Sequence, residues 1–133
     1  MQRKPRGFTL IELMIVLAVI AIIVSIAVPA FSAQMRKSRR SEAIARLQQL
    51  ALEQEKWRAS HASYGSTTDV PPGTLTHYDL TYSGVTSTGF TLTATAKSGD
   101  DQNRDRAGAT TCTPLTLTQA SGTQTRGSTA ACW

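Results

Sequence analysis

An apolar segment dominates the first part of the chain. The twelve residues from Leu13 to Val24 are all apolar, and between Phe8 and Val28 only Thr9, Glu12 and Ser25 are polar. A helix of this length extends about 32 Å, which matches the hydrocarbon core of a bilayer. The pattern therefore predicts a membrane-spanning helix. Its single carboxylate, Glu12, is costly to place in lipid, so its presence in this segment indicates a functional role.

A semi-apolar stripe with helical spacing follows this segment. The stripe consists of Ala43, Leu47, Leu50, Gln54 and Trp57, which recur at spacings of four, three, four and three. Ile44 and Ala51 widen it. No strong stop signal lies between Pro29 and Ala62, so we expect one helix over residues 8–62. Pro29 removes one backbone hydrogen bond inside this helix and predicts a kink.

The rest of the chain alternates between apolar and polar residues, as strands do. We expect strands over residues 77–83, 88–97 and 110–119, and a last short strand that ends near Trp133. The short link at residues 84–87 favours a hairpin, and residues 98–108 form a polar loop. Together the elements predict an α+β fold, in which a small antiparallel meander buries one face against the helix stripe.

Length and charge restrict what the chain can do. Its 133 residues, less a basic start and a membrane segment, leave roughly a hundred for one small water-soluble domain. The net charge is +5, but without Arg3, Lys4 and Arg6 only 11 basic residues face 9 acidic ones. The basic character therefore comes largely from the first residues, and it is weak evidence for an anionic partner.

The basic start and the apolar segment together indicate membrane targeting, and two interpretations compete. One is a secretory signal that is cleaved near Ala30 or Ala33. Against it, the apolar run exceeds a typical signal core, and Pro29 and Phe31 are unfavourable beside a small-residue cleavage site. The other interpretation rests on the series from Gly7 through Phe8 to Glu12 before the long apolar run. This series resembles the class III signal of type IV pilins and pseudopilins.

This resemblance implies how the chain is processed and divided. It implies cleavage between Gly7 and Phe8 by a prepilin peptidase, methylation of the new Phe8 amine, and pairing of Glu12 with the amine of a neighbouring subunit. It divides the chain into a leader (1–7), a transmembrane and filament-core helix (8–31) and a periplasmic or extracellular globular domain (32–133). We therefore expect a single-pass protein of the bacterial inner membrane, with its N-terminus in the cytoplasm, that later enters an extracellular pilus.

Basic residues flank the apolar segment on both sides, three before it and four between Arg36 and Arg40. The positive-inside rule therefore barely selects an orientation, and the family resemblance decides it. We interpret the four later bases as a solvated collar at the membrane surface. Contact with an anionic lipid or with DNA is the alternative.

The two cysteines, Cys112 and Cys132, are the only ones in the chain. In an exported protein they predict one disulfide. Closing a loop of twenty positions is worth about 3 kcal/mol in the chain-entropy model. This C-terminal region resembles the disulfide-bounded region of type IV pilins, and it is most similar to PilE-type minor pilins.

Two other patterns bear on metal binding. Residues 101–105 copy the opening of a calcium loop, but Arg106 replaces the required glycine and Cys112 the bidentate glutamate. A solvated turn is the alternative for this segment. His61 and His77 lack companion ligands, so no metal site is predicted.

Catalysis is not expected. No nucleophile motif or Ser/His/Asp spacing is recognisable, and so small a core leaves no room for a catalytic cleft. We therefore predict neither an enzyme nor a cofactor.

Four basic residues are candidates for a DNA-binding patch at the exposed end of the sheet: Lys97, Arg104, Arg106 and Arg126. Some minor pilins bind DNA through such patches. Asp100, Asp101 and Asp105 interleave with these bases and weaken their field.

The sequence therefore predicts a structural subunit of a type IV pilus, minor rather than major, that supports pilus assembly, adhesion or twitching motility. Its expected partners are other pilin subunits, the prepilin peptidase and, before assembly, the inner membrane. Two alternatives stay open, a DNA-binding minor pilin of an uptake pilus and a pseudopilin of a type II secretion system.

Overall fold

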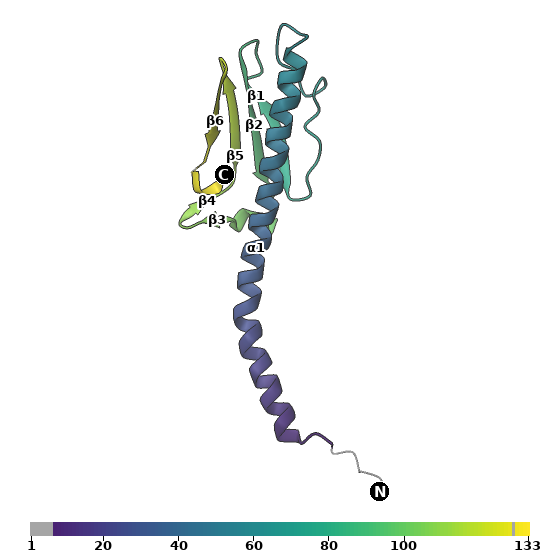
Figure 1. The fold of residues 1–133 in the computed structure, drawn as a ribbon, viewed down its shortest axis with the longest axis vertical. Coiled ribbons are helices and arrows are strands. Elements are labelled where there is room, and N and C mark those ends of the chain that lie inside the picture. Colours follow the sequence, from purple (N-terminus) through teal and green to yellow (C-terminus); the bar gives the residue numbers. More distant parts are fainter. Residues whose placement is uncertain (1–6, 129) are drawn as a thin grey trace. The chain divides into compact units, whose positions relative to one another are not determined.

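The computed structural model describes residues 7–128 and 130–133, and contains one long α-helix and an antiparallel sheet (Figure 1). The helix is α1 (Leu10–Arg58), and the strands are β1 (Tyr78–Ser83), β2 (Gly89–Ala96), β3 (Arg106–Ala107), β4 (Thr110–Thr111), β5 (Leu115–Ala120) and β6 (Thr123–Gly127). Two 3₁₀ helices, η1 (Asp101–Arg104) and η2 (Ala130–Cys132), complete the elements. The predicted α+β class is confirmed.

By their internal contacts, the residues form two units, an N-terminal unit up to Gln34 and a globular unit from Met35 to Trp133. Helix α1 begins in the first and ends in the second. It is shorter than the predicted 8–62 helix at both ends, most clearly at its C-terminus. There the Ser60 hydroxyl and the His61 ring bind the Trp57 carbonyl, at 3.3 and 2.9 Å. These side chains satisfy a terminal carbonyl locally, so the chain turns instead of continuing as a helix.

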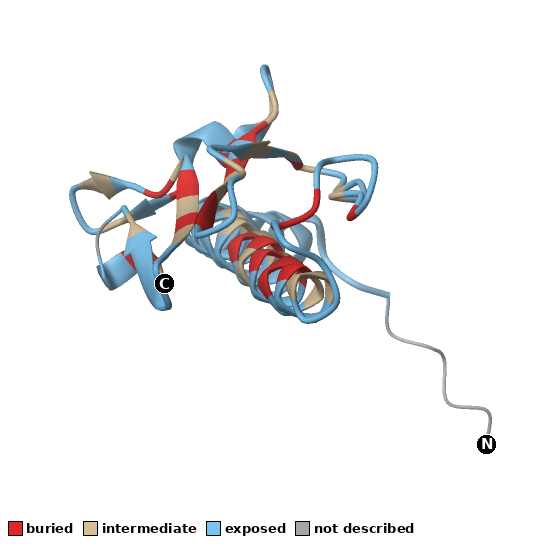
Figure 2. Ribbon diagram, turned by 90° about the horizontal axis from the view of Figure 1, so that it is seen from above, coloured by how far each residue is buried: buried red, intermediate tan, exposed pale blue. Residues whose placement is uncertain are grey.

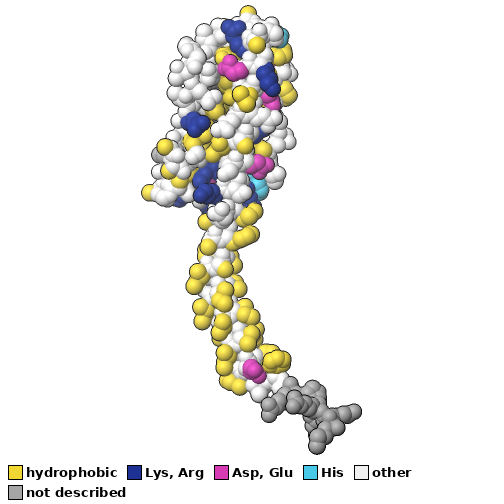
Figure 3. All heavy atoms as spheres, in the orientation of Figure 1, with side chains coloured by type: hydrophobic (Ala, Val, Ile, Leu, Met, Phe, Trp, Pro, Cys, Tyr) yellow, Lys and Arg dark blue, Asp and Glu magenta, His cyan; other side chains and the backbone are white. Residues whose placement is uncertain are grey.

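The apolar side chains of α1 in the N-terminal unit are exposed. Among the described residues, α1 is the one helix long and apolar enough to cross a membrane, and its most apolar window has a mean hydropathy of 3.0 with no buried residue. Figure 3 shows the hydrophobic side chains along this part of the helix. The helix continues through Pro29, and the kink at that residue stays a prediction.

In the globular unit, α1 buries the predicted stripe. Ala43, Leu47, Leu50 and Gln54 are at most 1% exposed, and Trp57 is half-buried. Figure 2 shows these buried positions on the part of α1 beside the sheet. Apolar residues on one helical face lose water contact against the sheet, and this burial is the main stabilising contribution to such a unit.

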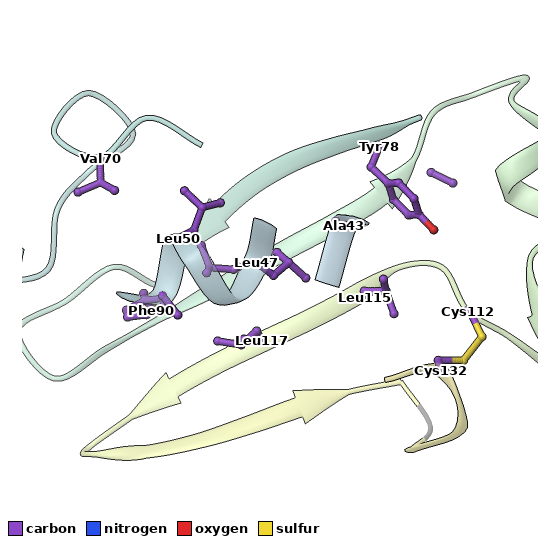
Figure 4. Close-up of a cluster of buried hydrophobic side chains, with 14 of the residues drawn as sticks. Ala43, Leu47, Leu50, Val70, Tyr78, Phe90, Cys112, Leu115, Leu117 and Cys132 are labelled. Carbon is purple, nitrogen blue, oxygen red and sulfur yellow. A yellow bond between two sulfur atoms is a disulfide. The ribbon is translucent and has the colours of Figure 1, made fainter. Parts of the chain in front are cut away.

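The main sheet has the strand order β1-β2-β5-β6, so the predicted antiparallel meander is confirmed. Its register places Leu92 opposite Leu117 and Ala94 opposite Leu115. The buried side chains of β2 and β5 meet those of α1 in one apolar cluster, shown in Figure 4. The alternating pattern of the sequence therefore indicated the buried face correctly.

The predicted strand over residues 110–119 is wrong as one element. Thr110 and Thr111 form β4, which pairs with β3 in a separate two-stranded sheet, and β5 begins only at Leu115. Pro114 between them has no N–H to donate to a ladder, so the strand is interrupted there. The polar loop over residues 98–108 also contains η1 and β3, and the last strand ends at Gly127, well before Trp133.

Candidate functional site

The start of α1 carries a reciprocal cap that the sequence analysis missed. The backbone N–H of Thr9 donates to Glu12 Oε2 at 3.4 Å, and the backbone N–H of Glu12 donates to Thr9 Oγ1 at 3.3 Å. This is a capping box, which satisfies two of the N–H groups that a helix leaves unpaired at its start. The spacing Thr-x-x-Glu before an apolar run was the signal that could have revealed it.

Phe8 lies next to this cap and extends the exposed apolar surface of α1 toward the N-terminus. Its side chain is 87% exposed, and it lines a hollow of about 440 Å³ with Glu12, Leu13, Val16 and Leu17. Phe8 and Leu13 occupy the two positions whose contact often fixes the chain entry into a helix. Residues 1–6 of the predicted leader lie outside the described residues, and the predicted cleavage point between Gly7 and Phe8 lies just inside the described part.

A second arrangement joins the segment around η1 to α1, and we call it the clasp. The clasp consists of Arg36 and Arg40 of α1, Tyr78 of β1, and Asp101, Gln102 and Asp105. Arg36 Nη1 lies 2.7 Å from Asp101 Oδ2, and Arg40 Nη1 lies 2.8 Å from Asp105 Oδ2. The Arg40–Asp105 pair is buried, with 8% and 3% of the two side chains exposed.

Gln102 is the neutral centre of the clasp. It is fully buried, and its Nε2 donates to the backbone oxygen of Arg36 at 2.9 Å and to the Tyr78 hydroxyl at 2.8 Å. Burial raises the pKa of Tyr78 to about 12, so its phenol stays uncharged well into the alkaline range. The segment around η1 is therefore attached to both the helix and the sheet.

Asp100 anchors the start of η1. Its Oδ1 accepts from the backbone N–H of Gln102 at 2.8 Å, and its Oδ2 lies 2.8 Å from Nδ1 of His77. The hydrogen bond with His77, and then that from Gln102, hold the pKa of the Asp100 carboxyl below its ordinary value. All three aspartates of this segment therefore have cationic or hydrogen-bonding partners.

These contacts bear on the calcium-like pattern. Asp101 and Asp105 face arginines, and the Asn103 amide donates to the backbone oxygens of Lys97 and Asp100 at 2.6 and 3.1 Å. Among the described residues no group of three His, Cys, Asp or Glu is arranged to hold a metal ion. Asn103 therefore lies in a solvated turn, with its side chain bonded to the backbone. The carboxylates of Asp101 and Asp105 instead pair with the two arginines of the clasp.

Two of the four bases in the predicted collar form ion pairs inside the globular unit instead of facing solvent. Arg36 and Arg40 point to Asp101 and Asp105. The spacing of four between the two arginines equals the spacing of four between the two aspartates. That match was present in the sequence, but nothing local indicates which distant segment it pairs with.

The four residues of the predicted DNA patch have different neighbours. Lys97 Nζ donates to the backbone oxygen of Leu75 at 2.8 Å, and the Arg126 guanidinium lies 5.5 Å from the ring centre of Trp133. Arg104 keeps 83% of its side chain exposed, with Asp101 3.7 Å away, and Arg106 is exposed on β3. Figure 3 shows lysine and arginine side chains gathered beside α1 at the level of β3 and β4.

The predicted disulfide is confirmed. Cys112 and Cys132 are bonded, with Cα atoms 5.4 Å apart, and the bond ties the chain after β4 to η2. It closes the C-terminal part of the globular unit, including β5 and β6, into one covalent loop.

Two family profiles match adjoining parts of the chain. Residues 2–28 match the prokaryotic N-terminal methylation motif. Residues 29–116 match the family described as type IV minor pilin ComP, DNA uptake sequence receptor. The second match covers the clasp, most of the sheet and the greater part of the chain.

Two curated relatives are similar to the chain over shorter stretches. The chain is 44% identical over 61 residues to the type IV major pilin protein PilA of Myxococcus xanthus (strain DK1622), which is 46% of this chain and 28% of that protein. It is 49% identical over 43 residues to the fimbrial protein EcpC of Eikenella corrodens, which is 32% of this chain and 28% of that protein. The chain thus aligns with little more than a quarter of each relative. No solved structure matches.

Proposed function

The chain belongs to the type IV pilin family, in the group described as minor pilin ComP, and from this we propose that it is a minor structural subunit of a type IV pilus. The observation that supports this most is the exposed apolar part of α1. Phe8, Ile11, Leu17 and Phe31 are each more than half exposed. Such a surface is unstable in water, and a bilayer and then the helices of neighbouring subunits would cover it.

Processing at Gly7 would prepare this helix for assembly. Cutting before Phe8 removes Arg3, Lys4 and Arg6, the charges that hold the leader in the cytoplasm. It leaves an N-terminal amine on Phe8, which family members methylate. The globular unit lies on the other side of the inner membrane in this proposal, and the finished subunit leaves the bilayer for the pilus.

Glu12 would direct the docking of one subunit on the next. Within the described part of the chain, its carboxylate accepts a long hydrogen bond from the Thr9 N–H, and a helix cap of this kind is worth about 1 kcal/mol. Pairing with the Phe8 amine of a neighbour at about 4 Å would gain roughly 4 kcal/mol at an effective dielectric constant near 20, before desolvation. This gross gain exceeds the contribution of the cap, and it arises only when the two charges meet, so it favours one axial register.

Substitutions at Glu12 test this proposal in the full chain. We expect Glu12→Ala to leave membrane insertion intact and to lower the amount of this subunit in sheared filaments about tenfold or more. Glu12→Gln separates the two roles, because glutamine also completes a capping box but carries no charge. Loss with Gln as with Ala supports the charge pair, whereas wild-type incorporation of either variant would contradict it.

Mass spectrometry of the assembled subunit tests the processing step. We expect an N-terminus at Phe8 that carries a methyl group. A mature chain that begins at Phe31 or Gln34 would instead indicate an ordinary secretory signal, and it would remove the filament-core helix from the proposal.

DNA binding is a second candidate function. The description of the matched family names a DNA uptake sequence receptor, and Arg104 and Arg106 are exposed in the same short segment of this chain. The clasp strengthens this candidate, because Arg36 and Arg40 neutralise the aspartates that otherwise weaken the field of these two arginines.

A salt titration of duplex binding by the full chain in detergent tests this candidate. We expect retardation of the duplex at low salt that disappears as salt rises. Replacing both Arg104 and Arg106 with Ala should reduce the slope of log K against log salt by about two, if each contacts one phosphate. Absence of any shift for the wild type at low salt would exclude the function.

A further inference from the structure

Three basic side chains project from the region of the clasp, and we call them the cationic rim: Lys37 of α1, Arg104 of η1 and Arg106 of β3. All three residues are exposed. The nearby carboxylates are already engaged: Asp100 by His77, Asp101 by Arg36, and Asp105 by Arg40. Asp101, which Arg104 also approaches at 3.7 Å, keeps 43% of its side chain exposed. The rim is therefore a set of exposed cations beside acids that are already paired or hydrogen-bonded within the chain.

The clasp fixes where this rim lies along the chain. It attaches the η1 segment to Arg36 and Arg40, and Arg36 follows the end of the apolar segment at Phe31 by five residues of the same helix. Five residues span at most about 18 Å even when fully extended, whatever angle the globular unit adopts. This proximity follows from chain connectivity and the ion pairs alone. Arg104 and Arg106 are thereby kept close to the residues that leave the apolar segment.

That position corresponds to the headgroup layer of a bilayer. Residues 8–31 extend about 36 Å as a helix, slightly more than a hydrocarbon core of about 30 Å. The residues that come next, from Ser32 to Lys37, therefore lie among the headgroups when the segment spans the membrane. The clasp bonds the η1 segment to Arg36, so chain connectivity keeps this segment within reach of the same layer.

We propose that, before assembly, the cationic rim binds the phosphates of anionic phospholipid headgroups and so seats the globular unit on the bilayer surface. Arginine suits this partner, because its guanidinium donates two parallel hydrogen bonds to one phosphate. Each basic side chain near an anionic membrane strengthens binding about fivefold. This inference rests on the proposed membrane-inserted state. Because Arg104 and Arg106 are also the candidate DNA contacts, lipid and DNA compete for them, and the arginines become free when the subunit enters a filament.

Hydrogen exchange of the full chain in nanodiscs tests this inference. The peptide over residues 97–111 is compared in phosphatidylcholine and in a mixture with phosphatidylglycerol. We expect exchange to slow by about an order of magnitude in the anionic bilayer at low salt, and the effect to weaken as salt rises. The double variant Arg104→Ser/Arg106→Ser should lose the protection. Arg126→Ser is the matched control, since it removes an exposed arginine of β6 outside the rim, and it should keep the protection.

The remaining outcomes contradict the inference in distinguishable ways. Equal exchange in both bilayers, or protection that survives the double variant, would overturn rim binding while leaving the membrane segment intact. Failure of the chain to insert into either nanodisc would overturn both this inference and the proposed function. If an added DNA duplex protects the peptide and the anionic bilayer does not, the rim is a nucleic-acid surface and not a lipid surface.

Discussion

Residues 10–34 and 35–58 belong to the same helix, yet their side chains have opposite environments. Leu17 in the first part is 57% exposed, whereas Leu47 in the second is 1% exposed. The polar residues are reversed as well. Glu12 is exposed at the helix start, while Arg40 and Gln54 are buried in the globular unit.

This difference separates the residues that need a partner from those that already have one. Buried Gln54 is bonded twice to the backbone of Gly65, at 2.8 Å in each case, and buried Arg40 is paired with Asp105. Buried polar groups whose hydrogen bonds are made within the chain stabilise the fold, and they do not indicate where other molecules bind. The exposed apolar side chains of the first part have no such internal cover, so they indicate where other molecules bind.

The largest expected effect is in the clasp. Replacing Arg40 with Ala leaves the carboxylate of Asp105 buried without its cation, and this should lower the free energy of unfolding of the globular unit by about 3–5 kcal/mol. Urea denaturation of the full chain in detergent measures it. The double variant Arg40→Met/Asp105→Leu removes both charges and should regain most of the loss. A double variant as unstable as Arg40→Ala would show that the pair itself, and not the unpaired charge, is decisive.

A matched pair of leucines tests the comparison directly. We expect Leu47→Ala to lower the free energy of unfolding of the globular unit by about 3 kcal/mol, because it opens a cavity in the core. Leu17→Ala should leave this free energy unchanged. Urea denaturation of both full-length variants in detergent measures the difference. Destabilisation of the globular unit by Leu17→Ala would break the division of α1 into an exposed and a buried part.

The disulfide should contribute a comparable amount. Replacing Cys112 and Cys132 with Ser opens a loop with a sequence separation of 20, which costs about 3 kcal/mol in the chain-entropy model. Thermal unfolding of the oxidised and reduced wild-type chain provides the control, because reduction should reproduce the substitution. Alkylation of both cysteines in the folded, unreduced protein would contradict the bond.

Regular periodicity is the reason that much of the fold could be predicted from the sequence. The helix stripe and the β1–β2 hairpin have patterns that depend only on neighbours along the chain, so the buried positions of Leu47 and Leu50 and the pairing of the two strands are predicted correctly. The interruption at Pro114 was missed because alternating residues continue on both sides of it. Local pattern alone could not show that β4 leaves the main sheet.

The candidate site divides in the same way. Gly7, Phe8 and Glu12 lie within six consecutive residues, so the sequence predicts their motif, although the capping box within it was not predicted. The clasp joins residues 65 positions apart. Its arginines therefore resembled a membrane collar and its aspartates a calcium loop. Each half has a plausible local explanation, and only the fold shows that the two neutralise each other.

The smallest effect is a pH dependence at Asp100. Because the pKa of this carboxyl is lowered in the folded chain, mainly by the hydrogen bond with His77, its charge stabilises the fold above the unfolded pKa of about 3.9. This contribution is lost as pH falls through the lower, folded pKa. At neutral pH we expect the free energy of unfolding of the wild type to exceed that of Asp100→Asn by less than about 1 kcal/mol, because the pair with His77 is partly solvated. This difference should vanish in acid. Carboxyl NMR titration measures the pKa directly, and His77→Ala should return it toward its ordinary value. A wild-type Asp100 that titrates at its ordinary pKa would show that the contact with His77 contributes no stabilisation.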